Sequence, residues 1–393
     1  MKKILILSSR VPYPQVGGDR LRIYNTAKTL SKNYEIDLLC LNEGRVESDY
    51  LERLKEVFNE VICFSYHPLK FKWNAFKGLF LKKPLQVSYY YFKEIQKWIN
   101  ERYGDYDLIF CNHIRTAEYI KNIVCAKIVD LHDAISMNYT RARLNAKGWW
   151  KVIYFIENKK LLPYEIKTTD EFDKSFIVSD IDRDYLVKNG AKRGKIITVP
   201  VAVREEVVNR VFKAKEKYEL VFLGKMDYPP NEDAVIYFVD RIFPILKKEK
   251  QNLKFIIVGA KPTKRVLKLR KTEGVEVTGF VEDHCKYIEA SKVFVAPIRF
   301  GAGIQNKILE AMALGKPVVT TSLGAEGIKG REGEHFLVAD KPEEMVEKIM
   351  NLLENKNRRG FIGRRARALI EEKYTWKIIG EQFLKEIGEI LKD

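Results

Sequence analysis

Short apolar runs alternate with amphipathic segments along the whole chain. The first run, residues 4–7 (Ile-Leu-Ile-Leu), is uninterrupted, as is typical of a strand buried on both faces of a parallel sheet. Similar runs occur at 35–41, 61–64, 107–111, 127–131, 175–179 and 196–199, and helical patterns lie between them at 19–31, 48–58, 91–102 and 181–189. Strands that alternate with helices predict an α/β, doubly wound domain.

A second series of the same kind follows residues 200–217, where the pattern is lost. Its strands are predicted at 218–223, 254–259, 276–280, 293–296 and 317–321. We therefore expect two domains, 1–200 and 218–375, a linker at 201–217, and a closing helix at 376–393 that joins the first domain. Two facing doubly wound domains would form a central cleft at the carboxyl ends of their strands, where ligands bind.

Composition narrows the class of protein. With 393 residues and 46% apolar side chains, the chain can bury large cores, which excludes a disordered protein. Its five cysteines form no Cys-x-x-Cys pair, which argues against a disulfide framework or a structural zinc site and favours the cytoplasm. No apolar run approaches the roughly 20 residues that a membrane-spanning helix needs.

The charge is strongly basic and unevenly distributed. Lys and Arg number 70 against 53 Asp and Glu, a net charge of +17, and the excess is concentrated in 64–103 and 141–160. In the first stretch, lysines alternate with aromatic residues: Lys70, Lys72, Lys77, Lys82 and Lys83 with Phe71, Trp73, Phe76 and Phe80. Such a surface can bind anionic lipid, a phosphorylated substrate or nucleic acid. The alternative is structural: the lysines are solvated and lie over aromatic rings that are buried. We expect peripheral contact with an anionic membrane and no nucleic-acid partner.

The strongest chemical signal lies in residues 293–327. A strand (293–296) runs into a loop and then into a helix predicted at 304–314. Gly301 and Gly303 would let the backbone approach a ligand, and the helix N-terminus would offer unpaired N–H groups to a diphosphate. Lys307 would add a positive charge, and Glu310 would accept hydrogen bonds from ribose hydroxyls. A plain βαβ crossover has similar glycine spacing, so the whole string carries the inference.

The string RFGAGIQNKILEAMALGKPVV resembles the retaining GT-B glycosyltransferases of family 4, and particularly a bacterial subset associated with exopolysaccharide and cell-surface glycans. The resemblance extends over nearly the whole chain. It implies two facing Rossmann-like domains and a nucleotide diphosphate sugar donor bound mainly by the C-terminal one, at Gly301, Ala302, Gly303, Ile304, Lys307 and Glu310. Many family members have a glutamate at the position of Ala302, so the resemblance does not identify the donor sugar.

The resemblance implies further donor contacts. Lys225, directly after the glycine that follows the first strand of the second domain, would bind the diphosphate; a solvated loop lysine would look the same in sequence. The nucleotide base would be held by backbone groups near Gly259, Phe280 and Val281. In the first domain, Gly17 and Gly18 match the family's glycine loop near donor and acceptor.

Gly17 and Gly18 also precede a predicted helix, so a second anion seat is expected there. Arg20 and Arg22 lie in the first turn of that helix, where each could bind phosphate bidentately or face solvent. Arg20 is our candidate for the acceptor. His113, which follows the predicted strand 107–111, is a second and weaker acceptor candidate.

His132 and Asp133 are the catalytic candidates. They stand in KIVDLHDAIS, just past an apolar strand. The resemblance places His132 where the family has a histidine beside the reacting sugar, although a histidine in this position is often structural. Asp133 could orient the imidazole ring or bind the acceptor.

Three aspartates, Asp180, Asp182 and Asp184, resemble the Asp-x-Asp of metal-dependent transferases. They sit where a helix begins, and carboxylates favour a helix N-terminus. Capping by Ser179 or Asp180 is therefore the better interpretation, and we predict no metal and no other cofactor. No Ser-His-Asp signature, GxGxxG or P-loop is present in the sequence, so hydride transfer and ATP hydrolysis lack support.

These features predict an enzyme that transfers a sugar, with retention, from a nucleotide diphosphate sugar to a hydroxyl of a lipid-linked or glycan acceptor. We expect it in the cytoplasm, peripheral on the inner face of the membrane. Two alternatives stay open: a nucleotide-sugar epimerase of the same architecture, which needs no acceptor, and a non-catalytic basic protein that binds lipid or nucleic acid.

Overall fold

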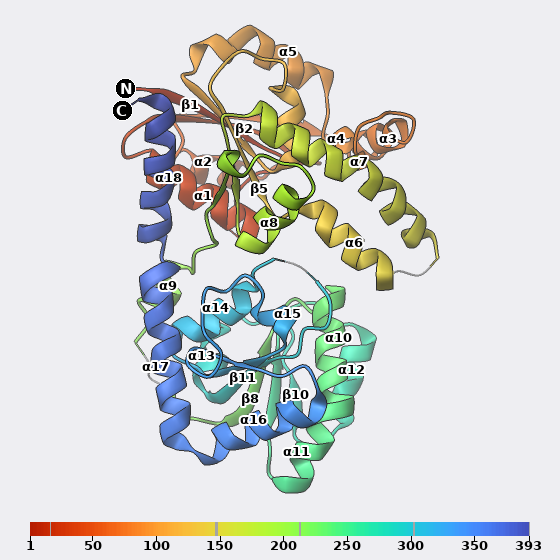
Figure 1. Cartoon of the computed structure of the whole chain (residues 1–393), viewed down its shortest axis with the longest axis vertical. Coiled ribbons are helices and arrows are strands. Elements are labelled where there is room, and N and C mark those ends of the chain that lie inside the picture. Colours follow the sequence, from red (N-terminus) through yellow and green to blue (C-terminus); the bar gives the residue numbers. More distant parts are fainter. Residues whose placement is uncertain (16, 146–147, 212–213, 302, 393) are drawn as a thin grey trace. The chain divides into compact units, whose positions relative to one another are not determined.

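Two compact units make up the chain (Figure 1). The computed structural model describes residues 1–392 except 16, 146–147, 212–213 and 302. Unit 1 comprises Met1–Val201 and Ile379–Asp393, and unit 2 comprises Ala202–Ile378. The stretch expected as a separate linker at 201–217 is thus part of unit 2 from Ala202 onward, because its described residues contact that unit.

Unit 1 is built on a seven-stranded parallel sheet with the order β3-β2-β1-β4-β5-β6-β7. The strands are β1 (Lys3–Ser8), β2 (Glu35–Glu43), β3 (Glu60–Tyr66), β4 (Leu108–Asn112), β5 (Lys127–His132), β6 (Lys174–Ile177) and β7 (Ile196–Thr198). In β1, Ile4 lies opposite Ile36 of β2 and Leu108 of β4. Residues 4–7 are buried, which confirms the prediction from their uninterrupted apolar run.

The helices of unit 1 are α1 (Gly18–Leu30), α2 (Ser48–Leu54), α3 (Pro68–Gly78), α4 (Leu85–Tyr89), α5 (Lys93–Arg102), α6 (Ile135–Asn145), α7 (Trp149–Glu171) and α8 (Asp180–Lys188). Sequence patterns did not predict α3, α4, α6 or α7. The 23-residue α7 carries apolar and charged residues on all sides and has Pro163 inside it, a residue that usually ends or kinks a helix. It packs against α6.

Unit 2 is built on a six-stranded parallel sheet with the order β10-β9-β8-β11-β12-β13. The strands are β8 (Tyr218–Leu223), β9 (Phe255–Val258), β10 (Val275–Val277), β11 (Ser291–Ala296), β12 (Val318–Thr320) and β13 (Leu337–Val338). The helices are α9 (Glu205–Val208), α10 (Pro229–Tyr237), α11 (Phe243–Glu249), α12 (Lys264–Lys268), α13 (Cys285–Glu289), α14 (Asn306–Ala313), α15 (Ser322–Ala325), α16 (Pro342–Glu354) and α17 (Lys356–Lys373). The α/β, doubly wound class is confirmed for both units.

The last helix, α18 (Trp376–Leu391), begins in unit 2 and continues into unit 1. Its Phe383 is fully buried, with its ring centroid 5.1 Å from that of Phe176 and 6.4 Å from that of Phe110 in the unit 1 sheet. Gly380 allows close packing on α1, because a Cβ at this position would lie 2.7 Å from the Thr29 methyl carbon. The helix therefore completes the core of unit 1.

Each sheet has one point at which the strand order reverses. It lies between β1 and β4 in unit 1 and between β8 and β11 in unit 2. In doubly wound sheets, ligands bind at the carboxyl ends of the strands beside such a point. The loops at those ends carry Gly17 and His113 in unit 1 and Lys225 and Gly301 in unit 2, all of them predicted site residues.

Candidate functional site

The β11–α14 loop is anchored to α10. The Arg299 guanidinium donates through Nε to Asp233 over 2.9 Å and lies 4.2 Å from the centroid of the Tyr237 ring. Gly301 and Gly303 have φ values of 129° and 70°, which L side chains rarely adopt, so this loop requires glycine. Ala302, predicted to contact the donor, lies outside the described residues.

The helix after this loop starts later than expected. It was predicted at 304–314, but α14 spans Asn306–Ala313, and Ile304 is a buried loop residue before it. The Gln305 side chain at the N-cap position makes no capping bond to the helix. No side-chain cap therefore competes with an anion for the first N–H groups of α14, and the anion site there stays a prediction.

Lys307 turns inward from the first turn of α14. Its Nζ donates to the Asn231 side-chain oxygen and lies 5.1 Å from the centroid of the Phe222 ring. Among the described residues no carboxylate pairs with it, and burial lowers the pKa of Lys307 to about 7. Asn231 also donates to the backbone carbonyl of Lys225 over 2.9 Å, which ties the β8–α10 loop to α14.

Lys225 itself lies at the exposed rim of this loop. Its Nζ is 3.2 Å from Asp227, and its side chain is 60% accessible. A lysine in this position can reach a ligand at the carboxyl end of β8, but it is also solvated. Its role toward a diphosphate stays a prediction.

Glu310 is held by two cationic partners. Arg204 Nε donates to one carboxylate oxygen over 3.1 Å, and His284 Nε2 lies 2.9 Å from the other. Burial would raise the pKa of Glu310, but the His284 hydrogen bond and the charge of Arg204 hold it below its usual range. Burial would lower the pKa of His284, but hydrogen bonds to Cys285 and Glu310 raise it to about 9.

Sequence reasoning missed both partners of Glu310. Arg204 lies in the stretch that was expected to be a linker. His284 lies between β10 and β11, at the same sheet edge as the predicted base contacts. The sequence did contain a signal for His284: it follows a predicted parallel strand, and polar residues after such strands gather at one edge of the sheet.

The predicted base-binding positions lie at neighbouring strand ends. Gly259 follows β9, and a Cβ there would lie 1.8 Å from the Gly224 carbonyl oxygen, so its glycine is required by packing. Phe280 and Val281 follow β10; the Phe280 ring is 77% exposed and Val281 is half-buried. The structure therefore places Lys225, Gly259, Phe280 and Gly301 along one edge of the unit 2 sheet.

In unit 1 the structure brings His113 and His132 together, with ring centroids 5.8 Å apart. Both have positive φ, 76° and 64°, which is uncommon outside glycine and is concentrated at functional sites. His132 Nε2 lies 2.9 Å from the Asn112 side-chain oxygen. Burial lowers the pKa of both histidines, so both rings are neutral near pH 7.

Arg22 is connected to His132 through Asp130, which also accepts the backbone N–H of His132. It is buried and donates to both carboxylate oxygens of Asp130, over 2.6 and 3.2 Å. It also donates to the carbonyls of Val199 and Pro200 over 3.0 and 2.9 Å. Arg22 is thus an internal brace between α1, β5 and the end of β7, and neither of its two predicted settings, phosphate binding or solvent, is correct.

Asp133 follows His132 in a half-buried position. Burial, assisted by the charge of Asp182, raises the pKa of Asp133 to about 7. Glu165 of α7, which sequence reasoning missed, accepts the backbone N–H of Ile135 over 2.8 Å at the start of α6. Burial raises the pKa of Glu165 to about 8. A half-buried and a buried carboxyl group, both with raised pKa, therefore lie near the start of α6.

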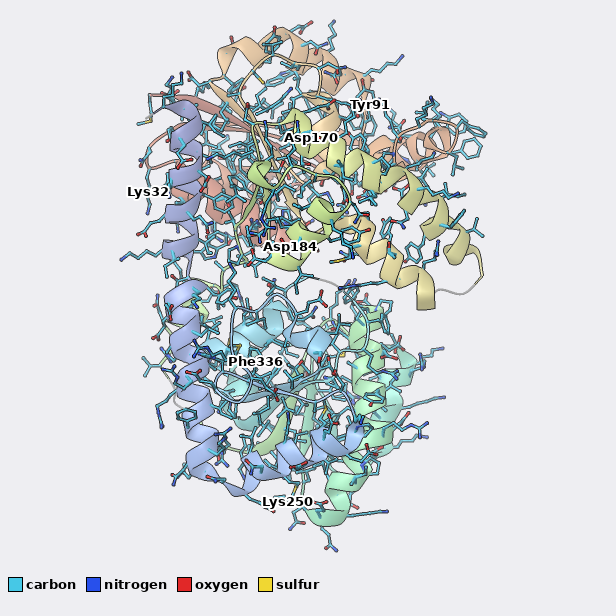
Figure 2. The ribbon with its side chains drawn as sticks, viewed as in Figure 1. Lys32, Tyr91, Asp170, Asp184, Lys250 and Phe336 are labelled. Carbon is cyan, nitrogen blue, oxygen red and sulfur yellow. The ribbon has the colours of Figure 1, made fainter. Side chains whose placement is uncertain are left out.

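The three aspartates of α8 have local partners. Ser179 caps the helix by accepting the Asp182 N–H over 3.1 Å, which confirms the capping interpretation. Asp182 accepts the Ala134 N–H over 2.9 Å. Asp180 pairs with Arg183 over 2.9 Å, and Asp184 (Figure 2) pairs with Arg183 and Arg193, each over 3.2 Å.

The glycine loop after β1 is exposed. Gly17 has a φ of 99° and precedes α1, and no side chain among the described residues caps that helix. Gly18 is also exposed, and Arg20 is half-buried, with its Nε buried and without a hydrogen-bond partner in the described chain. The anion site expected at the α1 N-terminus stays a prediction.

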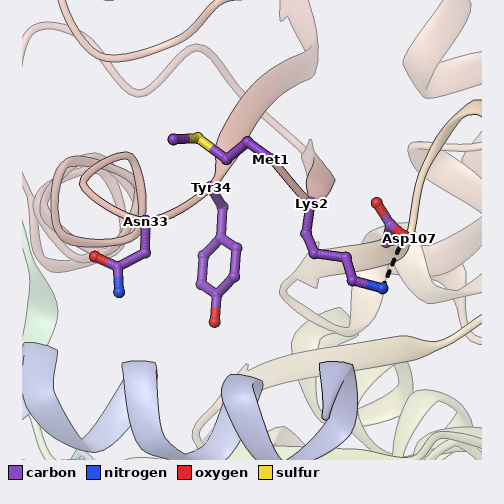
Figure 3. Close-up of a pocket in the computed structure, with 5 residues that line it drawn as sticks. All are labelled: Met1, Lys2, Asn33, Tyr34 and Asp107. Carbon is purple, nitrogen blue, oxygen red and sulfur yellow. Dashed lines mark ion pairs between the residues drawn. The ribbon is translucent and has the colours of Figure 1, made fainter. Parts of the chain in front are cut away.

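One cavity of unit 1 lies away from these residues (Figure 3). It measures about 650 Å³ and is lined by Met1, Lys2, Asn33, Tyr34 and Asp107, with Lys2 and Asp107 3.3 Å apart. These residues precede β1, β2 and β4, so the cavity opens at the amino ends of the strands. Doubly wound sheets bind substrates at the opposite edge.

Comparison with known proteins decides the class of enzyme. Residues 217–355 match the family model described as "Glycosyl transferases group 1". The fold of the whole chain is similar to the crystal structure of Anabaena HepE in complex with UDP, with a TM-score of 0.70, 16% identity, and coverage of 99% of this chain and 100% of that one. The chain is a glycosyltransferase with the GT-B fold.

Two bacterial proteins are similar to this glycosyltransferase over half of its length or more. It is 24% identical over 405 residues to an uncharacterized 44.6 kDa protein of the Klebsiella pneumoniae cps region, covering 98% of this chain and 100% of that protein. It is 25% identical over 242 residues to the capsular polysaccharide biosynthesis glycosyltransferase CapM of Staphylococcus aureus, covering 55% of this chain and 61% of CapM. Within the described residues, no helix of the glycosyltransferase is long and apolar enough to cross a bilayer.

Proposed function

We propose that this glycosyltransferase moves a sugar, with retention of configuration, from a nucleotide diphosphate sugar to a hydroxyl acceptor. The observation that carries the proposal is the glycine loop and uncapped N-terminus of α14 at the switch point of unit 2, inside the matched family region. Backbone N–H groups there can take up the charge that develops on a departing diphosphate. HepE, which shares the fold, has been crystallised with UDP and UDP-glucose.

Side chains near the N-terminus of α14 have different roles in the proposed reaction. Lys307, half-buried and bonded to the neutral side-chain oxygen of Asn231, gains a charged partner when a phosphate binds. Lys225 reaches the same edge from the rim. Glu310 accepts the ribose hydroxyls while Arg204 and His284 fix its orientation.

We assign His132 to a place beside the reacting sugar, as the resemblance to family 4 implies. In its neutral form, His132 can hydrogen-bond a sugar hydroxyl without adding charge. The acceptor hydroxyl then attacks from the face that the diphosphate leaves, and a phosphate oxygen takes its proton. Asp133, Arg20 and His113 orient the acceptor. The reaction as proposed needs no metal, because backbone N–H groups and lysines supply the positive potential.

The acceptor is proposed to be a lipid-linked or glycan molecule of bacterial cell-surface or exopolysaccharide synthesis. The names of CapM and of the Klebsiella cps-region protein support this setting. The basic excess of residues 64–103 supports peripheral attachment to the anionic inner face of the membrane.

A turnover assay tests the proposal. The full chain is incubated with UDP, GDP and ADP sugars, with and without lipid-linked acceptors, and release of nucleoside diphosphate is measured. We expect one donor to be turned over faster with acceptor, and NMR to show a product with the donor's anomeric configuration. An inverted product would contradict retention. Conversion of the donor to an epimer without acceptor would indicate the epimerase instead, and absence of nucleotide binding would contradict transfer altogether.

A further inference from the structure

Helix α3 presents two apolar faces, of which only one is covered. Phe71 and Gly78 are buried against unit 1. On the other side, Leu69, Trp73 and Phe76 are 63%, 57% and 51% exposed, and Phe80 in the following turn is 80% exposed. The Trp73 and Phe76 rings stack with centroids 5.5 Å apart. A continuous row of large apolar side chains therefore faces water, a pattern that marks an interaction surface.

This row is held rigidly by α7. Lys160 Nζ donates to the carbonyls of Gly78, Leu79 and Leu81 over 3.2, 3.2 and 2.6 Å. Glu157 accepts the N–H groups of Leu85 and Gln86 over 2.7 and 3.2 Å. Hydrogen bonds from α7 thus hold both ends of the turn that carries Phe80, so the exposed position of the Phe80 ring is fixed by the fold.

A cavity of about 490 Å³ lies beside α3. Its charged lining consists of Lys70, Lys77, Lys83, Lys93 and Glu94. Three of these ammonium groups lie over aromatic rings, Lys70 over Tyr66 at 5.3 Å, Lys77 over Trp73 at 5.4 Å and Lys83 over Tyr91 (Figure 2) at 5.1 Å. Lys83 also pairs with Glu118 over 2.6 Å. The cavity is therefore a cationic recess bordered by the exposed apolar row.

The occupant that fits both parts is an amphiphile with an anionic phosphate. Lysines near an anionic leaflet attract its headgroups, and aromatic rings settle at headgroup depth. Nucleic acid or an acidic peptide would leave Leu69 and Phe80 in water. The site also lies at the correct edge of the sheet, because α3 directly follows the carboxyl end of β3, and β5 with His132 is four strand spacings away, roughly 19 Å.

We propose that α3 docks unit 1 on an anionic membrane leaflet, with Trp73, Phe76 and Phe80 in the headgroup layer and one lipid phosphate in the recess of Lys70, Lys77 and Lys93. The idea rests on the proposed function in placing the acceptor at a membrane, and it names the elements that make the contact.

Vesicle flotation of the full chain tests the proposal. Phosphatidylcholine vesicles with phosphatidylglycerol should recover the protein, and pure phosphatidylcholine vesicles should not. The triple variant Lys70→Gln, Lys77→Gln, Lys93→Gln should lower the partition coefficient by roughly a hundredfold. The double variant Phe76→Ser, Phe80→Ser should also lose binding. Lys248→Gln, Lys268→Gln, Lys271→Gln is the matched control, since it removes the same charge from exposed positions of unit 2 and should bind like the natural chain.

UDP calorimetry on the same variants separates this proposal from the proposed function. All variants should keep the nucleotide affinity of the natural chain, because the donor is expected in unit 2 and the changes at α3 and its recess lie in unit 1. Thermal unfolding like that of the natural chain shows that unit 1 of each variant is folded. Equal vesicle binding by the recess variant and the control would overturn the docking proposal, as would equal recovery with neutral vesicles. Binding of single-stranded DNA without vesicle recovery would overturn it too. Normal flotation with no nucleotide binding would contradict only the transferase.

Discussion

For Glu310, sequence reasoning named a candidate residue but missed the residues that surround it. Its position six residues after the loop indicated a ribose contact, but only the structure reveals that Arg204 and His284 occupy its carboxylate. Both lie far from it in sequence, and no periodicity reports on such contacts. The turn at Gly301 and Gly303 was easier to predict from the sequence, because a backbone with positive φ strongly favours glycine.

Glu310→Ala should weaken nucleotide binding by roughly 1–3 kcal/mol, the loss of a charged hydrogen bond, while the fold survives. Titration calorimetry with the nucleoside diphosphate measures this. Glu206→Ala is the control, since Glu206 pairs with the same Arg204 over 2.9 Å but is exposed. Unchanged affinity of the Glu310 variant would remove this residue from the site.

His284 should make stability depend on pH. Its pKa is about 9 in the folded chain against an ordinary 6.5, so the folded state binds the extra proton. The stabilisation is complete below about pH 6.5 and is lost as pH rises through about 9, by at most about 3 kcal/mol. Denaturant unfolding from pH 6 to pH 9 should show a decline that His284→Gln flattens. Parallel curves for both proteins would disprove this coupling.

Lys307 should take up a proton when the diphosphate binds. With a pKa of about 7 it is largely neutral at pH 8, and a phosphate nearby restores its charge. Calorimetry at pH 8 in buffers of different ionisation enthalpy should show uptake approaching one proton, which Lys307→Met removes. Lys225→Met, at the exposed rim, should keep the uptake; if it abolished the uptake instead, the proton would belong elsewhere.

His132→Ala should reduce turnover by roughly tenfold or more and leave nucleotide affinity intact, because His132 belongs to unit 1. Steady-state rates and calorimetry on one preparation give both values. A His132 variant with normal turnover would show that the residue is structural.

At the level of elements, strands were predicted well and helices unevenly. Strands such as β1 and β11 are buried on both faces, so each contains an unbroken apolar run, at 4–7 and 293–296. Helices α3 and α7 escaped prediction for different reasons. Helix α3 has apolar residues on its exposed face as well as on its buried one, and α7 contains Pro163. Tertiary contacts, such as Glu157 and Lys160 with the α3–α4 turn, stabilise what local pattern does not indicate.

The N-terminus of α8 bears on metal dependence. Asp180 and Asp184 are engaged by Arg183 and Arg193, and Asp182 by Ser179 and Ala134. We therefore expect activity to persist in EDTA at the rate measured without it. Addition of manganese after chelation is the control. Activity that EDTA abolishes and manganese restores would revive the metal interpretation of these aspartates.

On the scale of the molecule, each of the two doubly wound sheets has its own point at which the strand order reverses. The predicted site residues are divided between these two points. Unit 2 carries the α14 seat, Lys225 and Glu310, while unit 1 carries His132, Asp133 and the glycine loop. This division followed from the sequence, because each βα series is continuous. The exact boundary did not, since residues such as Arg204 and Arg210 of the expected linker form ion pairs within unit 2.

The route of α18 has a consequence for biosynthesis. Unit 1 cannot close its core over Phe110 and Phe176 until Phe383 has been synthesised, and all of unit 2 is made in between. On the ribosome, the earlier unit therefore remains unfinished while the later one folds, contrary to the usual N-terminal-first order. A fragment ending at residue 201 should be aggregation-prone and should be rescued by supplying the missing helix as a separate peptide.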